Sequence, residues 1–238
     1  MLFRSAAYPD KPIRLIAPFA PGGNIDITAR TVAPGMGAEL GQTVVVENRG
    51  GAGGRIGTEM VVKAAPDGYT LLLGSSGSLT VNPAFAAVPA YHPVKDFVPT
   101  STVSIVPIML VTHPSLPVRT AQDFISLARA RPSAITMASA GTGSNGHLTG
   151  ELFQDITGVK LTHVPYKGSG PAVIDLAAGQ VHMMMDGLPS LIGQIKSGKL
   201  RALAAMADKR FAIFPDVPTM AEAGYPGLED GVWYGLSG

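Results

Sequence analysis

Short apolar runs alternate with helical periodicity along most of this chain. The apolar runs predict strands at 13–17, 43–47, 69–73, 134–138, 161–164, 183–185 and 200–206. Helical spacing predicts helices at 25–40, 56–65, 120–130, 147–157, from 169 or 171 to 178, and 188–196. We expect Asn24 to cap the first helix and Pro34 to kink or break it. The alternation indicates an α/β fold, with parallel sheets covered by helices on both faces.

The predicted elements form two series, at 13–74 and 134–206, joined by extended segments within 102–112. We therefore expect two lobes, each with a parallel-rich sheet. The expected boundaries are 8–101 plus 230–238 for lobe 1, 102–229 for lobe 2, and a hinge near 101–112 and 230–236. A further predicted strand, at 231–236, carries the only tryptophan and almost reaches the end of the sequence, so we expect a truncated C-terminus and an incomplete lobe 1.

Composition narrows the class of protein. Of the 238 residues, 46% are apolar and 15% are charged. Typical domains have about 25% charged residues, and a chain this apolar is not expected to be disordered. The formal net charge of +1, without a basic run, disfavours a nucleic-acid partner. There is no cysteine for a disulfide, a thiolate metal site or a nucleophile, and no stretch approaches the ~18 apolar residues of a membrane span.

Glycine-rich loops follow several predicted strands, at the edge where open α/β sheets bind ligands. The loop Pro-Gly-Gly-Asn at 21–24 precedes a helix, whose unpaired N–H groups form an anion site without a basic side chain. A plain left-handed turn before the helix is the alternative interpretation.

The loop Gly-Thr-Gly-Ser-Asn-Gly at 141–146 matches the dinucleotide-binding pattern G-x-G-x-x-G. That pattern also needs an acidic residue at the end of the next strand, where this chain has Val-Pro-Tyr-Lys at 164–167. We favour what remains of the pattern, a helix N-terminus surrounded by hydroxyl and amide groups that suit a carboxylate.

Two serines raise the question of a nucleophile. Ser75 and Ser76 lie in Gly-Ser-Ser-Gly-Ser at 74–78, but the G-x-S-x-G turn requires glycine where Ser78 stands, and no histidine is tied to them by spacing. The five histidines contain no i, i+4 pair, so we expect no zinc site. His147 is expected in the first turn of its helix, where it faces the cleft, caps the helix or is exposed.

Two charged residues near these loops have alternative interpretations. Lys167 either reaches an acidic ligand or is a flexible surface lysine. Asp186 ends the apolar strand at 183–185, so its carboxylate needs a polar partner. That partner is either an amino or hydroxyl group of a ligand, or the helix that follows.

A series of short motifs extends from residue 8 to residue 236. They lie at 8–13, 18–23 with Asp26 and 29–30, 44–54, 67–71, 95–97, 163–168, 198–204 and 215–219. Together they strongly resemble the Bug family, the periplasmic solute receptors associated with tripartite tricarboxylate transporters. The resemblance covers nearly the whole chain.

The resemblance implies a two-lobed periplasmic binding protein of type II, the Venus-flytrap fold. It implies capture of a small carboxylate: a dicarboxylate, an acidic amino acid or an aromatic acid. The implied location is periplasmic and the implied partners are the membrane subunits of a tripartite transporter. A monomer without catalysis, cofactor or metal is expected. Family members carry a secretory signal, and we find no such segment in this sequence.

The loop analysis and the resemblance together predict the ligand-binding residues. They are Phe19, Ala20, Pro21, Gly22, Gly23, Asp26, Ser75, Ser76, Ser139, Gly141, Thr142, Gly143, Ser144, Asn145, His147, Tyr166, Lys167 and Asp186. Two rival functions stay open. One is a ligand-dependent sensor that transports nothing. The other is an enzyme, either a serine hydrolase using 75–76 or a NAD-dependent oxidoreductase using 141–146.

Overall fold

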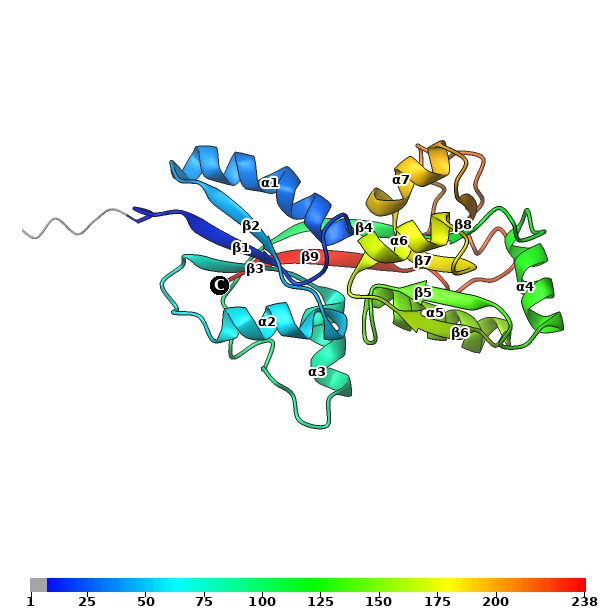
Figure 1. Cartoon of the computed structure of the whole chain (residues 1–238), viewed down its shortest axis with the longest axis horizontal. Coiled ribbons are helices and arrows are strands. Elements are labelled where there is room, and N and C mark those ends of the chain that lie inside the picture. Colours follow the sequence, from blue (N-terminus) through cyan, green and yellow to red (C-terminus); the bar gives the residue numbers. More distant parts are fainter. Residues whose placement is uncertain (1–7) are drawn as a thin grey trace, which may run out of the picture.

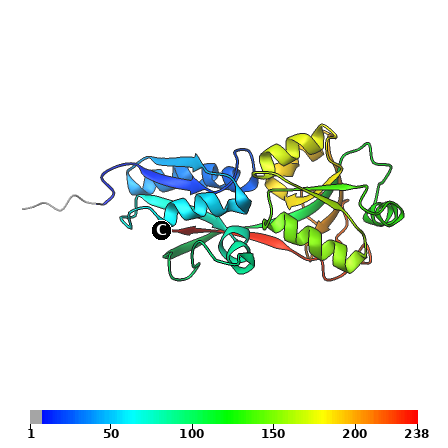
Figure 2. The same ribbon diagram turned by 60° about the horizontal axis from the view of Figure 1, so that its bottom comes forward.

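The computed structural model describes residues 8–238, which form two α/β halves connected by two long strands (Figures 1 and 2). The strands are β1 (Ile13–Ala17), β2 (Val44–Asn48), β3 (Thr70–Ser75), β4 (Pro99–Thr112), β5 (Thr136–Ser139), β6 (Thr162–Pro165), β7 (Met183–Gly187), β8 (Arg201–Met206) and β9 (Gly231–Ser237). The helices are α1 (Asn24–Leu40), α2 (Arg55–Val62), α3 (Asn82–Phe85), α4 (Ala121–Ala130), α5 (Asn145–Thr157), α6 (Ser169–Ala177) and α7 (Leu188–Lys196). The predicted α/β architecture is confirmed.

The first half is built on the parallel strands β2, β1 and β3, with β9 added antiparallel to β3. Successive residues of a strand point to opposite faces of the sheet, which explains how β1 is covered. Leu15 packs in the same cluster as Ile25 of α1, whereas Ile16 packs with Val61 of α2. The two helices therefore lie on opposite sides of the sheet (Figure 1).

The second half contains the parallel strands β6, β5 and β7, and β4 runs antiparallel to both β7 and β8. The parallel prediction thus holds for β1–β3 and for β5–β7, while β4, β8 and β9 add antiparallel pairs. Helix α4 begins with a capping box, in which the Thr120 hydroxyl accepts from the Asp123 amide and the Asp123 carboxylate accepts from the Thr120 amide.

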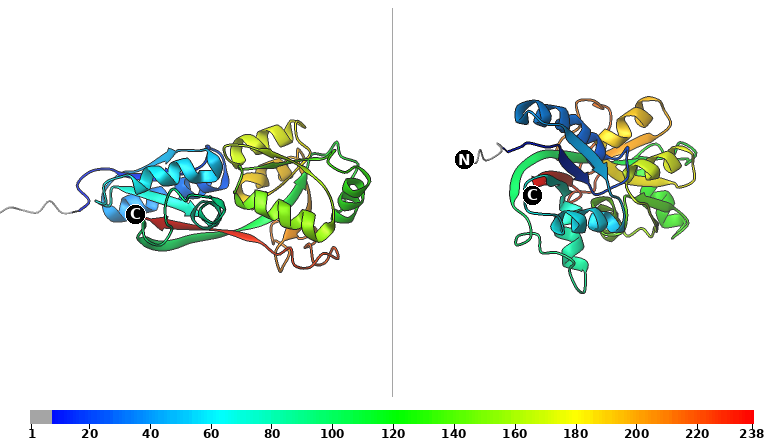
Figure 3. Two further views of the ribbon diagram at one scale, coloured as in Figure 1. Left: turned by 90° about the horizontal axis from the view of Figure 1, so that it is seen from below. Right: turned by 60° about the vertical axis from the view of Figure 1, so that its left-hand side comes forward.

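Strands β4 and β9 run side by side through both halves (Figure 3). Residues 99–107 of β4 pair with β9, and residues 108–112 pair with β7 and β8. We predicted two extended segments here, and the structure has one continuous strand. The exact lobe boundaries and the hinge positions stay a prediction.

Two local predictions for α1 are wrong. The helix runs unbroken past Pro34, which lies on its exposed face, where water can satisfy the Arg30 carbonyl that loses its partner. The residue that caps α1 is Gly23, in extended conformation, and Asn24 is already helical. Helix α5 likewise begins at Asn145, two residues before the predicted start.

Candidate functional site

A small cavity lies between the two halves, where the N-terminal ends of α1, α5 and α6 meet. Its volume is about 40 Å³, room for a few water molecules or a group the size of one carboxylate. The lining residues are Phe19, Gly23, Asn24, Ile25, Ser75, Ala140, Ser144, Asn145, Gly146, Ser169, Asp186, Val232 and Tyr234. This lining contains no lysine, arginine or histidine, so an anion bound there would be held by neutral donors.

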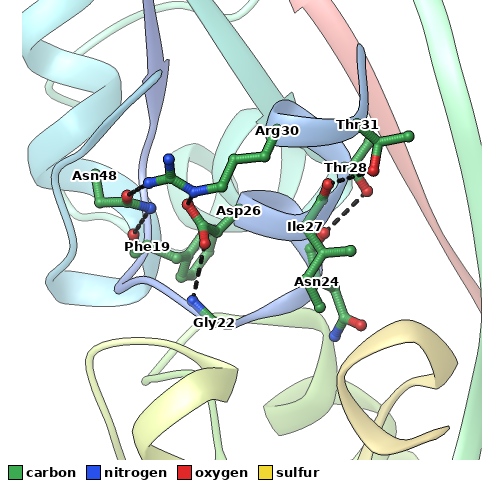
Figure 4. Close-up of polar contacts among 9 residues, drawn as sticks. All are labelled: Phe19, Gly22, Asn24, Asp26, Ile27, Thr28, Arg30, Thr31 and Asn48. Carbon is green, nitrogen blue, oxygen red and sulfur yellow. Dashed lines mark hydrogen bonds and ion pairs between the residues drawn. The ribbon is translucent and has the colours of Figure 1, made fainter. Parts of the chain in front are cut away.

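The loop before α1 is held by its own chain (Figure 4). The Gly22 amide donates to Asp26 Oδ2 at 2.9 Å, and Arg30 Nε donates to Asp26 Oδ1 at 2.9 Å. Arg30 also reaches Asn48 Oδ1 at 3.1 Å, and Asn48 Nδ2 donates to the Phe19 carbonyl. Gly22 and Asp26, both predicted to contact the ligand, therefore satisfy each other and brace the turn.

The N-terminus of α5 has no acidic brace of this kind, and the Gly143 amide before it donates to His147 Nδ1 at 3.2 Å. Its cap residue, Ser144, makes no capping hydrogen bond, and the first turn contains no acidic side chain. Ser144 is 2% exposed, and its hydroxyl has no partner within the described residues 8–238. A buried, unpaired hydroxyl beside the unpaired N–H groups and positive dipole end of a 13-residue helix is a suitable donor set for a carboxylate.

Asp186 lies at the end of β7 and is the one carboxyl group among the lining residues. It is 7% exposed and accepts hydrogen bonds from Ser169 Oγ at 2.9 Å, Ser190 Oγ at 2.7 Å and Asn24 Nδ2 at 2.9 Å. Burial raises its pKa, while the hydrogen bonds from Ser190, Ser169, the Gly187 amide and Asn24 oppose that shift.

Asn24 connects the two halves through both ends of its side-chain amide. Its Nδ2 donates to Asp186, and its Oδ1 accepts from the Ser190 amide at 2.9 Å, in the first turn of α7. Figure 4 shows the Asn24 side chain directed away from Asp26 and toward the second half. This role needs the side chain to leave its own loop, which is why it does not cap α1 as predicted.

Tyr234 of β9 contributes a hydroxyl to the same cavity. The side chain is 5% exposed, and its hydroxyl makes none of the hydrogen bonds found among residues 8–238. Burial, helped by the Asp186 carboxylate, raises its pKa well above the usual value, so the phenol is neutral and able to donate. Sequence reasoning missed Tyr234, Asn24 and Ser169, because each reaches the cavity only through the fold.

Facing glycines bring the backbones of the two halves into direct contact. The Ala20 amide of the first half donates to the Lys167 carbonyl of the second at 2.9 Å. A Cβ at Gly170 would lie 2.1 Å from the Pro21 carbonyl oxygen, and a Cβ at Gly53 would lie 2.2 Å from that of Thr142. These glycines allow an approach that side chains would prevent.

The other predicted residues of the α5 loop form a separate cluster next to the cavity. Ser139 is hydrogen-bonded to His163 Nε2 at 2.6 Å and accepts from the Gly141 amide. The His147 ring stacks on His163 with centroids 4.0 Å apart, and its Nδ1 accepts from the Gly143 amide. Burial, with a contribution from His147, lowers the pKa of His163 to about 4.

The remaining predicted residues also make internal contacts. The Tyr166 hydroxyl donates to Asp175, and Lys167 contributes its backbone carbonyl to the contact between the halves. Ser75 is bonded to Ser78, and the Ser76 hydroxyl donates across the halves to Asn145 Oδ1 at 3.0 Å. Neither serine contacts a histidine within the described part of the chain.

Some of the predicted ligand-binding residues therefore line the cavity, and others lie outside it. Six of them line it: Phe19, Gly23, Ser75, Ser144, Asn145 and Asp186. Ala20, Pro21, Ser76, Gly141 and Lys167 lie at the contact between the halves. Thr142, Gly143 and His147 border a neighbouring surface groove of about 360 Å³ next to α3.

Comparison with known proteins decides the family. Residues 28–238 match the family described as the tripartite tricarboxylate transporter family receptor, TctC. The chain belongs to the TctC family. BugT of Bordetella pertussis, one similar curated protein, is 46% identical over 230 residues, which cover 96% of this chain and 71% of BugT.

Solved relatives of this TctC protein have the same fold. The periplasmic binding protein BugD is 41% identical with a TM-score of 0.93, over 97% of this chain and 77% of that one. Rpa4515 of R. palustris, solved with adipate, is 39% identical with a TM-score of 0.93 and the same coverage. These relatives confirm the predicted Bug resemblance and the periplasmic-binding-protein fold.

Within residues 8–238, no helix combines the length and apolarity needed to cross a membrane. The same residues hold no cluster of three or more histidine or acidic side chains that could bind a metal ion.

Proposed function

We propose that this TctC protein is a periplasmic receptor that captures a small carboxylate between its two halves. In this proposal it passes the ligand to the membrane subunits of a tripartite tricarboxylate transporter and catalyses no reaction. The relatives support this function, because they are solute-binding proteins and one was solved with a dicarboxylate bound.

The observation that carries the proposal is the unpaired, buried Ser144 hydroxyl at the N-terminus of α5, facing a cavity without basic side chains. A helix N-terminus binds a carboxylate through N–H groups and its dipole, and a buried hydroxyl without a partner is costly unless a ligand pairs with it. The neutral phenol of Tyr234 adds a third kind of donor from β9.

Ligand entry requires the halves to separate. The cavity of about 40 Å³ holds one carboxylate group, far below the ~300 Å³ or more of a pocket that encloses a whole small molecule. We therefore propose that bending of β4 and β9 near 101–112 and 230–236 opens the cleft, and that closure over the ligand follows.

A thermal-shift screen tests the proposal. The protein is heated with a panel of mono-, di- and aromatic carboxylates, and each acid is matched with its neutral amide as a control. A ligand present at about 100 times its Kd stabilises the folded state by about 2.7 kcal/mol, so at least one acid is expected to raise Tm while its amide does not. A panel in which no acid raises Tm contradicts the proposed function.

The sensor alternative shares the same binding step. Deletion of the transporter's membrane subunits separates the two, with growth on the identified ligand as the measurement. Growth that depends on those subunits supports uptake, and growth that is unaffected supports a sensor.

A further inference from the structure

The cavity contains one acidic residue, which lies at the end of β7. Asp186 is its one carboxyl group, and its three side-chain partners, Ser169, Ser190 and Asn24, are neutral donors. No cation among the described residues pairs with it. A buried carboxylate without a cation is under-compensated, because hydroxyl and amide donors offset only part of the lost hydration.

Asn24 shows which chemistry Asp186 accepts from across the cleft. Its Nδ2 comes from the opposite half and donates to Asp186 Oδ2 at 2.9 Å, so this contact exists only when the halves are together. The Ser190 hydroxyl lies close to both Asp186 and the Gly187 carbonyl, at 2.7 and 3.1 Å, and can rotate between them. Asp186 can therefore exchange a protein donor for a ligand donor without losing all its partners.

A negatively charged ligand group beside Asp186 would be repelled where a hydrogen-bond donor is bound. A ligand group that takes the place of the Asn24 amide would lie within hydrogen-bond distance of the Asp186 carboxylate. Like charges at such separations in a buried site repel strongly, and no lysine or arginine lines the cavity to relieve the repulsion.

We infer that Asp186 is a specificity-determining residue, which selects carboxylates bearing an ammonium or hydroxyl group on the neighbouring carbon. It disfavours a second carboxylate next to Asp186. The inference rests on the proposed function, because it assumes that the ligand carboxylate occupies the α5 end beside Ser144. The ligand donor then points to Asp186, and the cavity recognises both the charge and the orientation of the ligand.

Three four-carbon acids provide the test, since succinate, malate and aspartate differ at C2 by a hydrogen, a hydroxyl or an ammonium group. Their Kd values are measured by titration calorimetry. The wild type is expected to bind malate and aspartate at least about 10-fold more tightly than succinate, the effect of one hydrogen bond to a charged group. In Asp186→Asn this preference is expected to fall below about 3-fold.

Two control variants separate specificity from closure and folding. Asn24→Ala removes the Asn24 hydrogen bonds between the halves but keeps Asp186. All three affinities should therefore change by a similar factor, and the preference should persist. Asp155→Asn removes an exposed carboxylate from α5 in the same half and should change nothing. Unfolding curves of each variant establish that it is folded.

The outcomes of these titrations test the role of Asp186 separately from the proposed capture of a carboxylate. Equal wild-type affinities for the three acids, or a preference that survives in Asp186→Asn, overturn the inference and leave carboxylate capture intact. A wild type that binds none of the three acids, nor any acid of the wider panel, overturns the proposed function itself.

Discussion

Two glycine-rich loops, each between a strand and a helix, differ in the hydrogen bonds that hold them. In the loop before α1, the Gly22 amide is bonded to Asp26 in the first turn of the helix. In the loop before α5, the first turn has no acidic residue and the Ser144 hydroxyl has no partner among residues 8–238. The α1 loop is thus held by an acidic side chain, whereas the Gly143 amide of the α5 loop is held by His147, and the unpaired group of the α5 loop is the Ser144 hydroxyl.

The largest expected effect concerns the backbone contact between the two halves at Gly170 and Pro21. Gly170→Ala puts a Cβ 2.1 Å from the Pro21 carbonyl oxygen, in a helix where alanine is otherwise favourable. The halves should no longer close, and carboxylate affinity should fall about 100-fold or more, because the binding-competent state is depopulated. Titration calorimetry measures the loss.

Gly193→Ala is the matched control for this change. Gly193 is also helical, in α7, and nothing lies within 4 Å of its added Cβ. Its affinity should equal that of the wild type. A Gly170→Ala protein that binds normally would show that closure of these backbones is not required.

The second prediction compares the two loops directly. Ser144→Ala removes a ligand donor and should weaken binding about 10-fold with little effect on stability. Asp26→Asn removes the brace of the other loop, so it should lower the free energy of unfolding by about 1–3 kcal/mol and change the affinity by less than about 3-fold. Affinity and denaturant unfolding are measured for both; the reverse pattern would exchange the roles of the loops.

The third and smallest effect is on pH dependence. The α5 loop is braced by Ser139, His163 and His147 in place of an acid. The folded-state pKa of His163 is about 4, below the ordinary value of 6.5, so protonation favours the unfolded chain. His163 therefore contributes stability above pH 6.5 that is progressively lost as the pH falls toward 4.

In His163→Gln, Tm should decline less steeply between pH 7 and pH 4.5, by a few degrees over that interval. Parallel profiles for His163→Gln and the wild type would show that the histidine pair does not titrate with folding.

The sequence predicts the elements well, because local patterns determine them. The strands β1 and β7 and the helix α7 appear within one or two residues of the expected positions. Pro34 misled the prediction for α1, since its exposure to water is a tertiary property. The single strand β4 was split in two, because its pairing changes from β9 to β7 and β8 part-way along it.

The site was only partly predictable from the sequence. Ser144 and Asp186 follow strands whose carboxyl ends meet, a topological rule that sequence patterns can anticipate. Tyr234 comes from a strand more than two hundred residues along the chain, and Asn24 acts by reaching the opposite half. No periodicity or spacing encodes such contacts, because they depend on how the two halves meet.

The contact between the halves, built from facing glycines and backbone groups, has a consequence for how binding preferences diversify. Main-chain atoms are the same in every sequence. A substitution at these positions can therefore hinder closure of the two halves, but it cannot change which ligand is preferred. Ligand selectivity must then depend on the few side chains that line the cavity. A new ligand preference can arise from one or two substitutions among them, with the contact between the halves unchanged.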